Sequence, residues 1–302
     1  MEQIAITPGT YIVAVSGGVD SMVLLDIARQ LTGVSLVVAH VDHGIRKDSS
    51  QDKELVERVA MSHNIPFESI QLALGSGVSE ERARDERYKF LRHIQKRYAA
   101  DGILVAHHAD DVLETALINL ARGTGWRGLS SLRSQGGIVR PLLPVKKSEI
   151  IEYAHEHHIS WREDSTNADT TYARNAIRAR LAHADDESLQ KLNEIIVRQN
   201  ELTQQIEQQV AEWLSHNSSE TNYATTLPRY QLIMLPEHVA HEVLQTVLRR
   251  KSGKSATRPQ IARAVLFAKV AKVGKRMPLN SSVQLRTTRH EVIVEVGKNV
   301  IS

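Results

Sequence analysis

Three polar clusters in the first part of the chain contain the residue types that bind and process phosphates. They are the glycine-rich stretch Ser16–Ser21, the segment His40–Arg46 and the segment His107–Asp111. Serine hydroxyls and glycine-loop N–H groups bind anions, and aspartate oxygens hold Mg²⁺. Histidines beside aspartates are also ligands of hydrolytic metal centres. Which chemistry follows depends on whether the fold brings these clusters to one place.

The stretch Ser16–Ser21 has the sequence Ser-Gly-Gly-Val-Asp-Ser and lies between two apolar segments. The run Tyr11–Val15 before it is typical of a buried strand, and Met22–Leu25 after it opens an amphipathic helix. A strand, a glycine loop and a helix N-terminus in this order present free N–H groups at the positive end of the helix dipole. The glycines let an anion approach the backbone, and Asp20 could hold a Mg²⁺ that bridges phosphate oxygens.

This loop lacks the lysine of the common nucleoside triphosphatase loop. That loop has the pattern G-x-x-x-x-G-K-[ST], and no lysine follows Gly17 and Gly18 here. This excludes transfer of a γ-phosphate by the common loop. The chemistry that the stretch Ser16–Ser21 would then support is the departure of pyrophosphate. Taken alone, the stretch is equally compatible with an ordinary strand-to-helix turn.

Each of the three clusters follows a predicted strand. Further strands and the helices between them are expected at residues 34–39, 48–63, 66–72, 79–99, 102–106 and about 109–122. Strands that alternate with helices predict an α/β fold with a doubly wound, mainly parallel sheet. Ligands bind such sheets at the carboxyl ends of the strands. Because the clusters follow the first, second and fourth strands, they should converge, which favours a nucleotide site over three unrelated turns.

The composition is that of a globular protein without membrane spans or cysteine chemistry. Of the 302 residues, 41% are hydrophobic and 24% are charged, and the length suits two domains. No apolar run approaches the roughly 20 residues of a membrane span, and the N-terminus has no signal-peptide pattern, so we expect a cytoplasmic protein. The absence of cysteine excludes disulfides, cysteine zinc sites, iron–sulfur ligation and thiol catalysis.

A smaller α+β domain is predicted at the C-terminal end. A long helix at residues 188–216 ends in the polar run His216–Asn222, and helices near 236–250 and 258–272 precede two alternating strands. The net charge of the whole chain is only +3, but residues 249–290 contain many lysines and arginines and few acidic residues. This asymmetry suits a nucleic-acid-binding module, although a basic solvated face gives the same pattern. The predicted domains are a catalytic domain at residues 1–185, a linker helix at 186–220 and a basic nucleic-acid-binding domain at 221–302.

With these motifs in hand, the chain resembles a known family. The stretch Ser16–Ser21 is similar to the pyrophosphate loop of the N-type ATP pyrophosphatases (the PP-loop superfamily), which split ATP between its α- and β-phosphates. From about Tyr11 to Arg180 the chain resembles the tRNA(Ile)-lysidine synthetases, whereas the C-terminal part is similar mainly in size and charge. The segments that carry this resemblance are His40–Arg46, Ala83–Tyr88, His107–Thr115, Arg122–Gly125, Arg140–Leu143, Glu163–Asn167 and Arg174–Arg178.

The resemblance implies an adenine nucleotide alpha hydrolase-like fold and a two-step ligation that uses ATP and Mg²⁺. The C2 oxygen of a wobble cytidine, in an isoleucine tRNA with the anticodon CAU, attacks the α-phosphorus and pyrophosphate leaves. The amine of free L-lysine then attacks the activated C2 and AMP leaves. The expected partners are this tRNA and lysine, and the expected state is a monomer or a homodimer.

The same resemblance assigns roles to individual residues. The nucleotide-binding residues are Ser16, Gly17, Gly18, Val19, Asp20, Ser21, Ala39 and His40. The catalytic residues are Asp20, Arg87, Asp110, Asp111 and Glu114, with Asp20 also the Mg²⁺ ligand. The contacts to lysine or tRNA are Asp42, Arg46, Arg84, Arg87, Asp111, Glu114, Arg122, Arg174 and Arg178. Asp111 and Glu114 lie one helical turn apart and point the same way, so either could bind the amine or accept its proton.

Three other classes of protein remain open at this level. A PP-loop enzyme acting on another tRNA base or on a small carbonyl compound shares the loop, and in the small-molecule case it releases pyrophosphate without tRNA. A nucleotide-binding module of the universal-stress type shares the sheet but gives no reason for the acidic residues after His108. A metal-dependent hydrolase built on His107 and His108 predicts tight binding of a transition metal.

Overall fold

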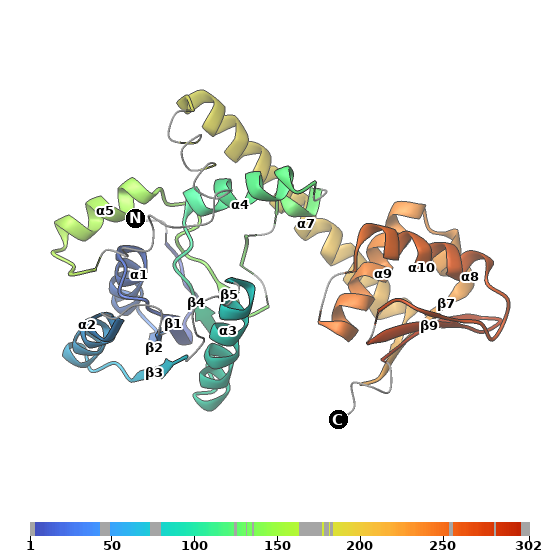
Figure 1. Ribbon diagram of the computed structural model, residues 1–302, viewed down its shortest axis with the longest axis horizontal. Coiled ribbons are helices and arrows are strands. Elements are labelled where there is room, and N and C mark those ends of the chain that lie inside the picture. Colours follow the sequence, from blue (N-terminus) through green and yellow to red (C-terminus); the bar gives the residue numbers. More distant parts are fainter. Residues whose placement is uncertain are drawn as a thin grey trace. The chain divides into compact units, whose positions relative to one another are not determined.

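The computed structural model describes residues 4–42, 49–72, 80–123, 126–130, 132–134, 136–162, 177, 181, 184–253, 256–280 and 282–296. The chain forms two compact units, Met1–Asn200 and Glu201–Ser302. Each unit has its own sheet and its own hydrophobic core, and each is described separately (Figure 1).

The first unit is built on a five-stranded sheet in the order β3-β2-β1-β4-β5, in which every strand pair is parallel. Its strands are β1 (Gly9–Ala14), β2 (Val34–Asp42), β3 (Phe67–Gln71), β4 (Gly102–Leu104) and β5 (Ile138–Val139). The strand order reverses between β1 and β4, so the loops after these two strands lie at a topological switch point. The predicted doubly wound α/β fold is confirmed.

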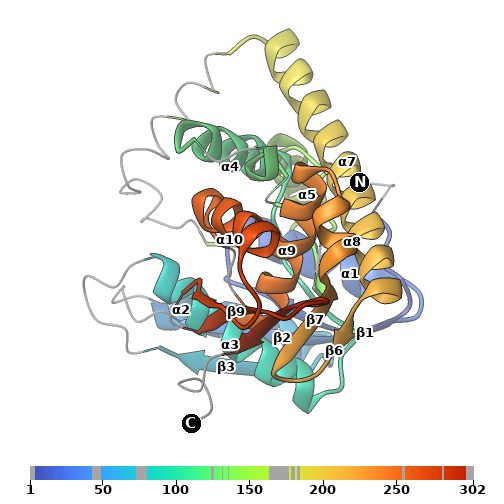
Figure 2. The same cartoon turned by 90° about the vertical axis from the view of Figure 1, so that its right-hand side faces the viewer.

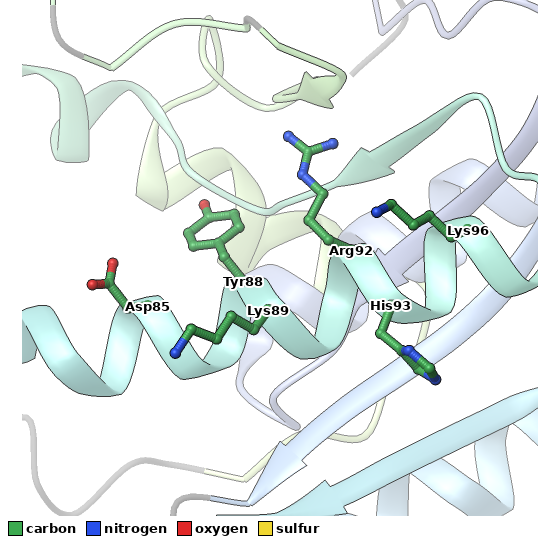
Figure 3. Close-up of a pocket in the computed structure, with 6 residues that line it drawn as sticks. All are labelled: Asp85, Tyr88, Lys89, Arg92, His93 and Lys96. Carbon is green, nitrogen blue, oxygen red and sulfur yellow. The ribbon is translucent and has the colours of Figure 1, made fainter. Parts of the chain in front are cut away.

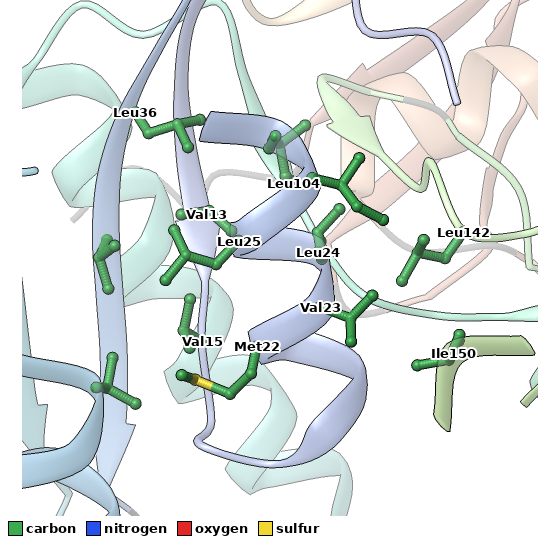
Figure 4. Close-up of a cluster of buried hydrophobic side chains, with 14 of the residues drawn as sticks. Val13, Val15, Met22, Val23, Leu24, Leu25, Leu36, Leu104, Leu142 and Ile150 are labelled. Carbon is green, nitrogen blue, oxygen red and sulfur yellow. The ribbon is translucent and has the colours of Figure 1, made fainter. Parts of the chain in front are cut away.

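Helices cover both faces of this sheet (Figure 1). They are α1 (Val19–Gln30), α2 (Ser49–Ser62) and α5 (Lys147–Glu156) on one face and α3 (Glu80–Arg97) on the other. Successive side chains of β1 point to opposite faces of the sheet. Val13 packs with α1 on one face, and Ile12 packs with Leu91 of α3 on the other. Burial on both faces explains why the central strands β1 and β2 are largely apolar, whereas the edge strand β3 is polar at three of its five positions and only partly buried. Figure 4 shows the α1 side of this core, with Leu24 and Leu25 among the strand residues.

Helix α4 (Ala109–Ala121) begins just after β4 and is followed by the short 3-10 helix η1 (Trp126–Gly128). Val112 and Ala116 of α4 are buried with Leu132 and with Ile196 of α7 (Asp186–Asn217). This packing fixes the N-terminal end of α4, and with it the segment His107–Asp111, at the carboxyl edge of the sheet.

The second unit is a five-stranded antiparallel sheet in the order β6-β7-β10-β9-β8, with three helices on one side (Figures 1 and 2). The strands are β6 (Ser219–Glu220), β7 (Ala224–Pro228), β8 (Arg276–Pro278), β9 (Val283–Thr287) and β10 (Glu291–Val296). The helices are α8 (Arg229–Met234), α9 (Glu237–Ser252) and α10 (Arg258–Val270). Inward residues of the strands, such as Leu285 and Val292, pack on Val243 and Leu244 of α9. The predicted α+β class is confirmed, with more strands than the two that the sequence pattern indicated.

The division between the two units falls inside α7, after Asn200. The functional boundaries 1–185, 186–220 and 221–302 stay a prediction. In the part of the chain that the structure describes, every helix is too short or too polar to span a bilayer.

Candidate functional site

The loop between β1 and α1 is held in a shape that presents its backbone to an anion. Gly17 has φ +95°, in the region that favours glycine, and Gly18 is the N-cap of α1. The Ser21 hydroxyl donates to the Gly18 carbonyl at 2.9 Å and accepts the Ser16 N–H at 3.1 Å. Because the first N–H groups of a helix have no partner within it, the first turn of α1, Val19 included, can donate to a phosphate.

Replacing Gly17 by alanine should destabilise the protein more than the same change at Gly18. A Cβ on Gly17 would combine a left-handed φ with a contact of 3.4 Å to Asp52 Cβ, whereas Gly18 has φ −75° and only the Ser16 hydroxyl, at 3.5 Å, nearby. We expect a loss of about 1–3 kcal/mol for Gly17→Ala and a smaller loss for Gly18→Ala. Urea unfolding of both variants is the measurement, and equal losses would show that the loop is not strained at Gly17.

Two residues that the sequence did not single out support this loop. Arg162 donates its backbone N–H to the Gly17 carbonyl at 3.0 Å, and its Nε lies 2.7 Å from Asp52 Oδ1. Asp52 is 6% exposed, in the first turn of α2. The burial of Asp52 could have been predicted from the sequence. Asp52 precedes the apolar positions Leu55 and Val56 by one helical turn, so it lies on the buried face of α2.

The end of β2 contributes His40, which joins it to the end of β1. His40 Nδ1 lies 2.9 Å from the Val15 carbonyl, so Nδ1 carries the proton and donates to it. Burial lowers the pKa of His40, which keeps the imidazole neutral. The Ala39 carbonyl accepts the Val15 N–H at 3.0 Å, and Asp42 is buried at the end of the same strand. Both strand ends are thus fixed beside the loop.

The N-terminal end of α4 brings three carboxylates around one histidine. His108 Nε2 lies 3.4 Å from Asp111 Oδ2 and 3.9 Å from Asp20 Oδ2, and His108 Nδ1 lies 3.4 Å from Asp110 Oδ2. The His108 N–H also donates to Asp111 Oδ2 at 3.0 Å. The structure therefore brings Asp20 of the glycine loop together with Asp110 and Asp111, although about 90 residues separate them.

These neighbours move the pKa values of the acids in opposite directions. His108 holds the pKa of Asp110 down at about 2. Burial raises the pKa of Asp111, and the charges of Asp20 and Glu114 add to this against the opposing effect of His108. For His108, burial lowers the pKa, but Asp110, Asp111 and Asp20 together raise it above the ordinary value. Carboxylates whose pKa values are pushed apart are suited to different roles, and Asp111 is the better proton acceptor.

Lys147 supplies the lysine that the glycine loop lacks. It is the first residue of α5, and its Nζ lies 2.5 Å from Asp20 Oδ1, while its backbone N–H donates to Asp110 Oδ2 at 2.8 Å. No local pattern in the sequence connects Lys147 with Asp20, which lies 127 positions earlier. A cation at this place stands next to the N–H groups that would receive a phosphate.

A second, cationic cluster surrounds His107. Arg140 donates from Nε to His107 Nδ1 at 3.1 Å, so the neutral ring carries its proton on Nε2. Burial, followed by the charges of Arg140, Arg87 and Arg84, lowers the pKa of His107 to about 3. Arg84 and Arg87 each place their guanidinium carbon 5.4 Å from the centre of the Tyr88 ring. This cluster is suited to a carboxylate or a phosphate.

The depressed pKa of His107 predicts a loss of stability in mild acid. The unfolded imidazole binds a proton near pH 6.5, whereas the folded one does so only near pH 3. Stability is therefore complete above about pH 6.5 and falls as the pH drops towards 3, by up to about 1.4 kcal/mol per pH unit from this one group. Urea unfolding at pH 7, 6, 5 and 4 measures the slope, and His107→Gln should flatten it. The same slope in this variant would contradict the assignment.

The other predicted site residues fall into three groups. Glu114 is 3% exposed and lies close enough to Asp111 to raise its pKa. Arg122 is exposed at the C-cap of α4, at the opposite end of that helix from Asp110 and Asp111. Three predicted contact residues lie outside the described residues: Arg46, Arg174 and Arg178.

Asp20 is the residue that fits a magnesium ion. Within the described ranges, no group of three or more metal-binding side chains could hold a metal by itself. Mg²⁺ is commonly held by one or two carboxylates and by substrate phosphates, and Asp20, 30% exposed beside the glycine loop, suits this arrangement. A hydrolase centre on His107 and His108 fits less well, because Arg140 already donates to His107 and adds a positive charge.

Comparison with known proteins places this site in a family. A family model described as the PP-loop domain matches residues 3–185, which include the glycine loop, both clusters and the whole parallel sheet. The chain belongs to the PP-loop family. Its glycine loop is therefore a PP-loop, as the resemblance of Ser16–Ser21 implied.

Curated relatives share the PP-loop unit most strongly. The chain is 42% identical over 180 residues to a tRNA(Ile)-lysidine synthase of Thermotoga sp. (strain RQ2), a match that covers 56% of this chain and 44% of the relative. It is 33% identical over 260 residues to the tRNA(Ile)-lysidine synthase of Bacillus subtilis (strain 168), covering 79% of this chain and 55% of that protein. The matches span about half the length of these relatives.

A solved structure shares the fold at low sequence identity. The U34-tRNA thiolase NcsA from Methanococcus maripaludis, solved with its [4Fe-4S] cluster, has 15% identity and a TM-score of 0.56. The match covers 67% of this chain and 76% of the thiolase. The present PP-loop protein contains no cysteine, so it has no thiolate with which to hold such a cluster.

Proposed function

We propose that this PP-loop protein joins L-lysine to C2 of the wobble cytidine of a tRNA(Ile) with the anticodon CAU. The reaction consumes ATP, passes through an adenylated cytidine and yields lysidine, AMP and pyrophosphate. One observation carries the proposal: Asp20 of the PP-loop and the acids Asp110 and Asp111 meet at the switch point of the sheet. The tRNA(Ile)-lysidine synthases among the relatives support the choice of substrate.

In the first step the C2 oxygen of cytidine attacks the α-phosphorus, and the bond to pyrophosphate breaks. The N–H groups of Ser16–Ser21 receive the departing pyrophosphate, and Lys147 adds a positive charge beside them. Mg²⁺ bound at Asp20 would neutralise further charge on the same group. Lys147 and Mg²⁺ would compete for Asp20, so a Mg²⁺ ion bound there would leave Lys147 available to contact a phosphate.

In the second step the lysine amine attacks C2, the bond from C2 to the adenylate oxygen breaks, and AMP leaves. The amine loses a proton on attack, and Asp111 is the acceptor because its pKa is raised. Glu114, buried beside it, holds the incoming amine through its negative charge. The arginines next to His107, Arg84 and Arg87, pair with the lysine carboxylate.

The second unit would hold the body of the tRNA. Its region from residue 249 to residue 290 is rich in lysine and arginine, and such a region binds phosphates without reading the sequence. Residues 221–302 are thus the proposed tRNA-binding domain, with further phosphate contacts from Arg122, Arg174 and Arg178. A cytoplasmic monomer or homodimer is the proposed working form.

The test is direct detection of the product. The protein is incubated with ATP, L-lysine and a tRNA(Ile) transcript bearing CAU, and the nucleosides are analysed by mass spectrometry for cytidine that has gained lysine and lost water. The methionine tRNA with the same anticodon, and a reaction without ATP, are the controls and should stay unmodified. Pyrophosphate release without tRNA would favour the alternative, a PP-loop enzyme acting on a small carbonyl compound.

A further inference from the structure

Helix α3 carries a row of cationic side chains that the proposed reaction does not use. Six of its residues line a cavity of about 510 Å³ (Figure 3), and they are Asp85, Tyr88, Lys89, Arg92, His93 and Lys96. At about 100° per residue, these positions fall within an arc of about 140° on the helix. Three of the six are lysine or arginine and one is histidine, against a single acid, so this face of α3 is strongly positive.

The charges of this row lie at the surface. Lys89 is 71% exposed, and among the described residues it pairs with Glu86 of the preceding turn, a type of ion pair that contributes little. Lys96 and His93 are exposed as well. Arg92 is different, because it donates to Gln95 at 2.7 Å and to the Gly136 carbonyl and is thereby held against the body of the unit. Lys89 and Lys96 are therefore the side chains that a ligand can recruit.

The row leads to the candidate site. Its member Tyr88 has Arg84 and Arg87 over its ring, and both arginines act on His107. From Tyr88 to Lys96 the helix rises about 12 Å. The cations are thus spread along a line that ends at the arginines beside His107. A small anion is bound by donors that converge on one point, whereas a line of separated charges matches successive phosphates of a strand.

We infer that the α3 row binds, through Lys89 and Lys96, the phosphate backbone of the RNA strand that carries the target base into the site. The inference rests on the proposed function, since it takes the substrate to be an RNA. Phosphate contacts fix the position of a strand without reading its sequence, so the row sets the register of the target base rather than its identity.

The double variant Lys89→Ala/Lys96→Ala tests this. Binding of tRNA to the full chain is measured by filter binding over a range of salt concentrations, together with steady-state kinetics of lysine incorporation. Loss of two phosphate contacts should make the slope of log K against log salt shallower by about 1.4 for a single strand. KM for the tRNA should rise, while kcat and the KM values for ATP and lysine stay unchanged.

The control is Arg29→Ala/Arg58→Ala, which removes two exposed cations from α1 and α2. It should leave the salt slope as in the wild type. An unchanged slope in the α3 variant, or an equal change in the control, would overturn the inference, and so would a raised KM for ATP. If the wild type binds tRNA but modifies none, the proposed function fails, while the salt slopes still decide whether α3 contacts RNA.

Discussion

Asp111→Asn should lower lysine incorporation into tRNA by about 10²- to 10⁴-fold, the range expected for loss of a positioned proton acceptor. Asp111 is the acid whose pKa burial raises, and it lies 3.4 Å from His108 Nε2 beside the PP-loop aspartate. Asparagine keeps an oxygen that accepts the His108 N–H, so the start of α4 should remain capped. The measurement is transfer of labelled lysine to tRNA under single-turnover conditions.

Comparison with a second variant separates an effect on catalysis from an effect on folding. Asp111→Ala removes both the charge and the hydrogen bond, and it should lose about 1 kcal/mol of stability that the asparagine variant retains. Adenylation of the tRNA, measured as pyrophosphate release in the absence of lysine, should persist in Asp111→Asn because the first step does not use this group. Wild-type rates of lysine incorporation in that variant would remove Asp111 from the reaction.

Lys147→Ala should lower the rate of pyrophosphate release by about 10²- to 10³-fold, the usual effect of removing one preorganised charge from a reacting oxyanion. Lys147 is the cation that the structure places against Asp20, next to the N–H groups of the PP-loop. Its loss leaves less positive charge beside the departing pyrophosphate, and it also removes the ion pair with Asp20.

The neighbouring lysine provides a matched control. Lys146 is exposed at the N-cap of α5. Its backbone N–H donates to Glu149 at 2.8 Å, and its backbone carbonyl accepts the Ile150 N–H at 3.2 Å. Lys146→Ala removes the same charge one position away and should release pyrophosphate at the wild-type rate. Equal losses in the two variants would mean that general surface charge, rather than a contact at the PP-loop, sets the rate.

The sequence was most informative where chemistry is local. The order of strand, glycine loop and helix around Ser16–Ser21 is encoded by neighbouring residues, and so is the spacing of Asp110, Asp111 and Glu114 on one helix. The parallel sheet followed from the alternation of strands and helices, because a buried parallel strand requires a continuous apolar run such as that of β2.

The missed features depend on contacts between distant positions. Lys147 pairs with Asp20, 127 positions earlier in the chain, and Arg162 pairs with Asp52, more than 100 positions earlier. No local sequence pattern predicts either pair. The strand β6 has two polar residues, and β8 is three residues long. Strands this short exist because a longer neighbour offers them hydrogen bonds, as β7 does for β6, and not because of their own propensity.

The central claim is that this PP-loop activates a base in RNA, and ATP–pyrophosphate exchange tests it most directly. Labelled pyrophosphate is incubated with the protein, ATP and Mg²⁺, with or without tRNA(Ile) bearing CAU, and its incorporation into ATP is measured. We predict exchange only when this tRNA is present. Addition of lysine should lower the exchange rate, because lysine consumes the adenylated cytidine before pyrophosphate can reverse its formation. Exchange at the same rate without tRNA would contradict the central claim.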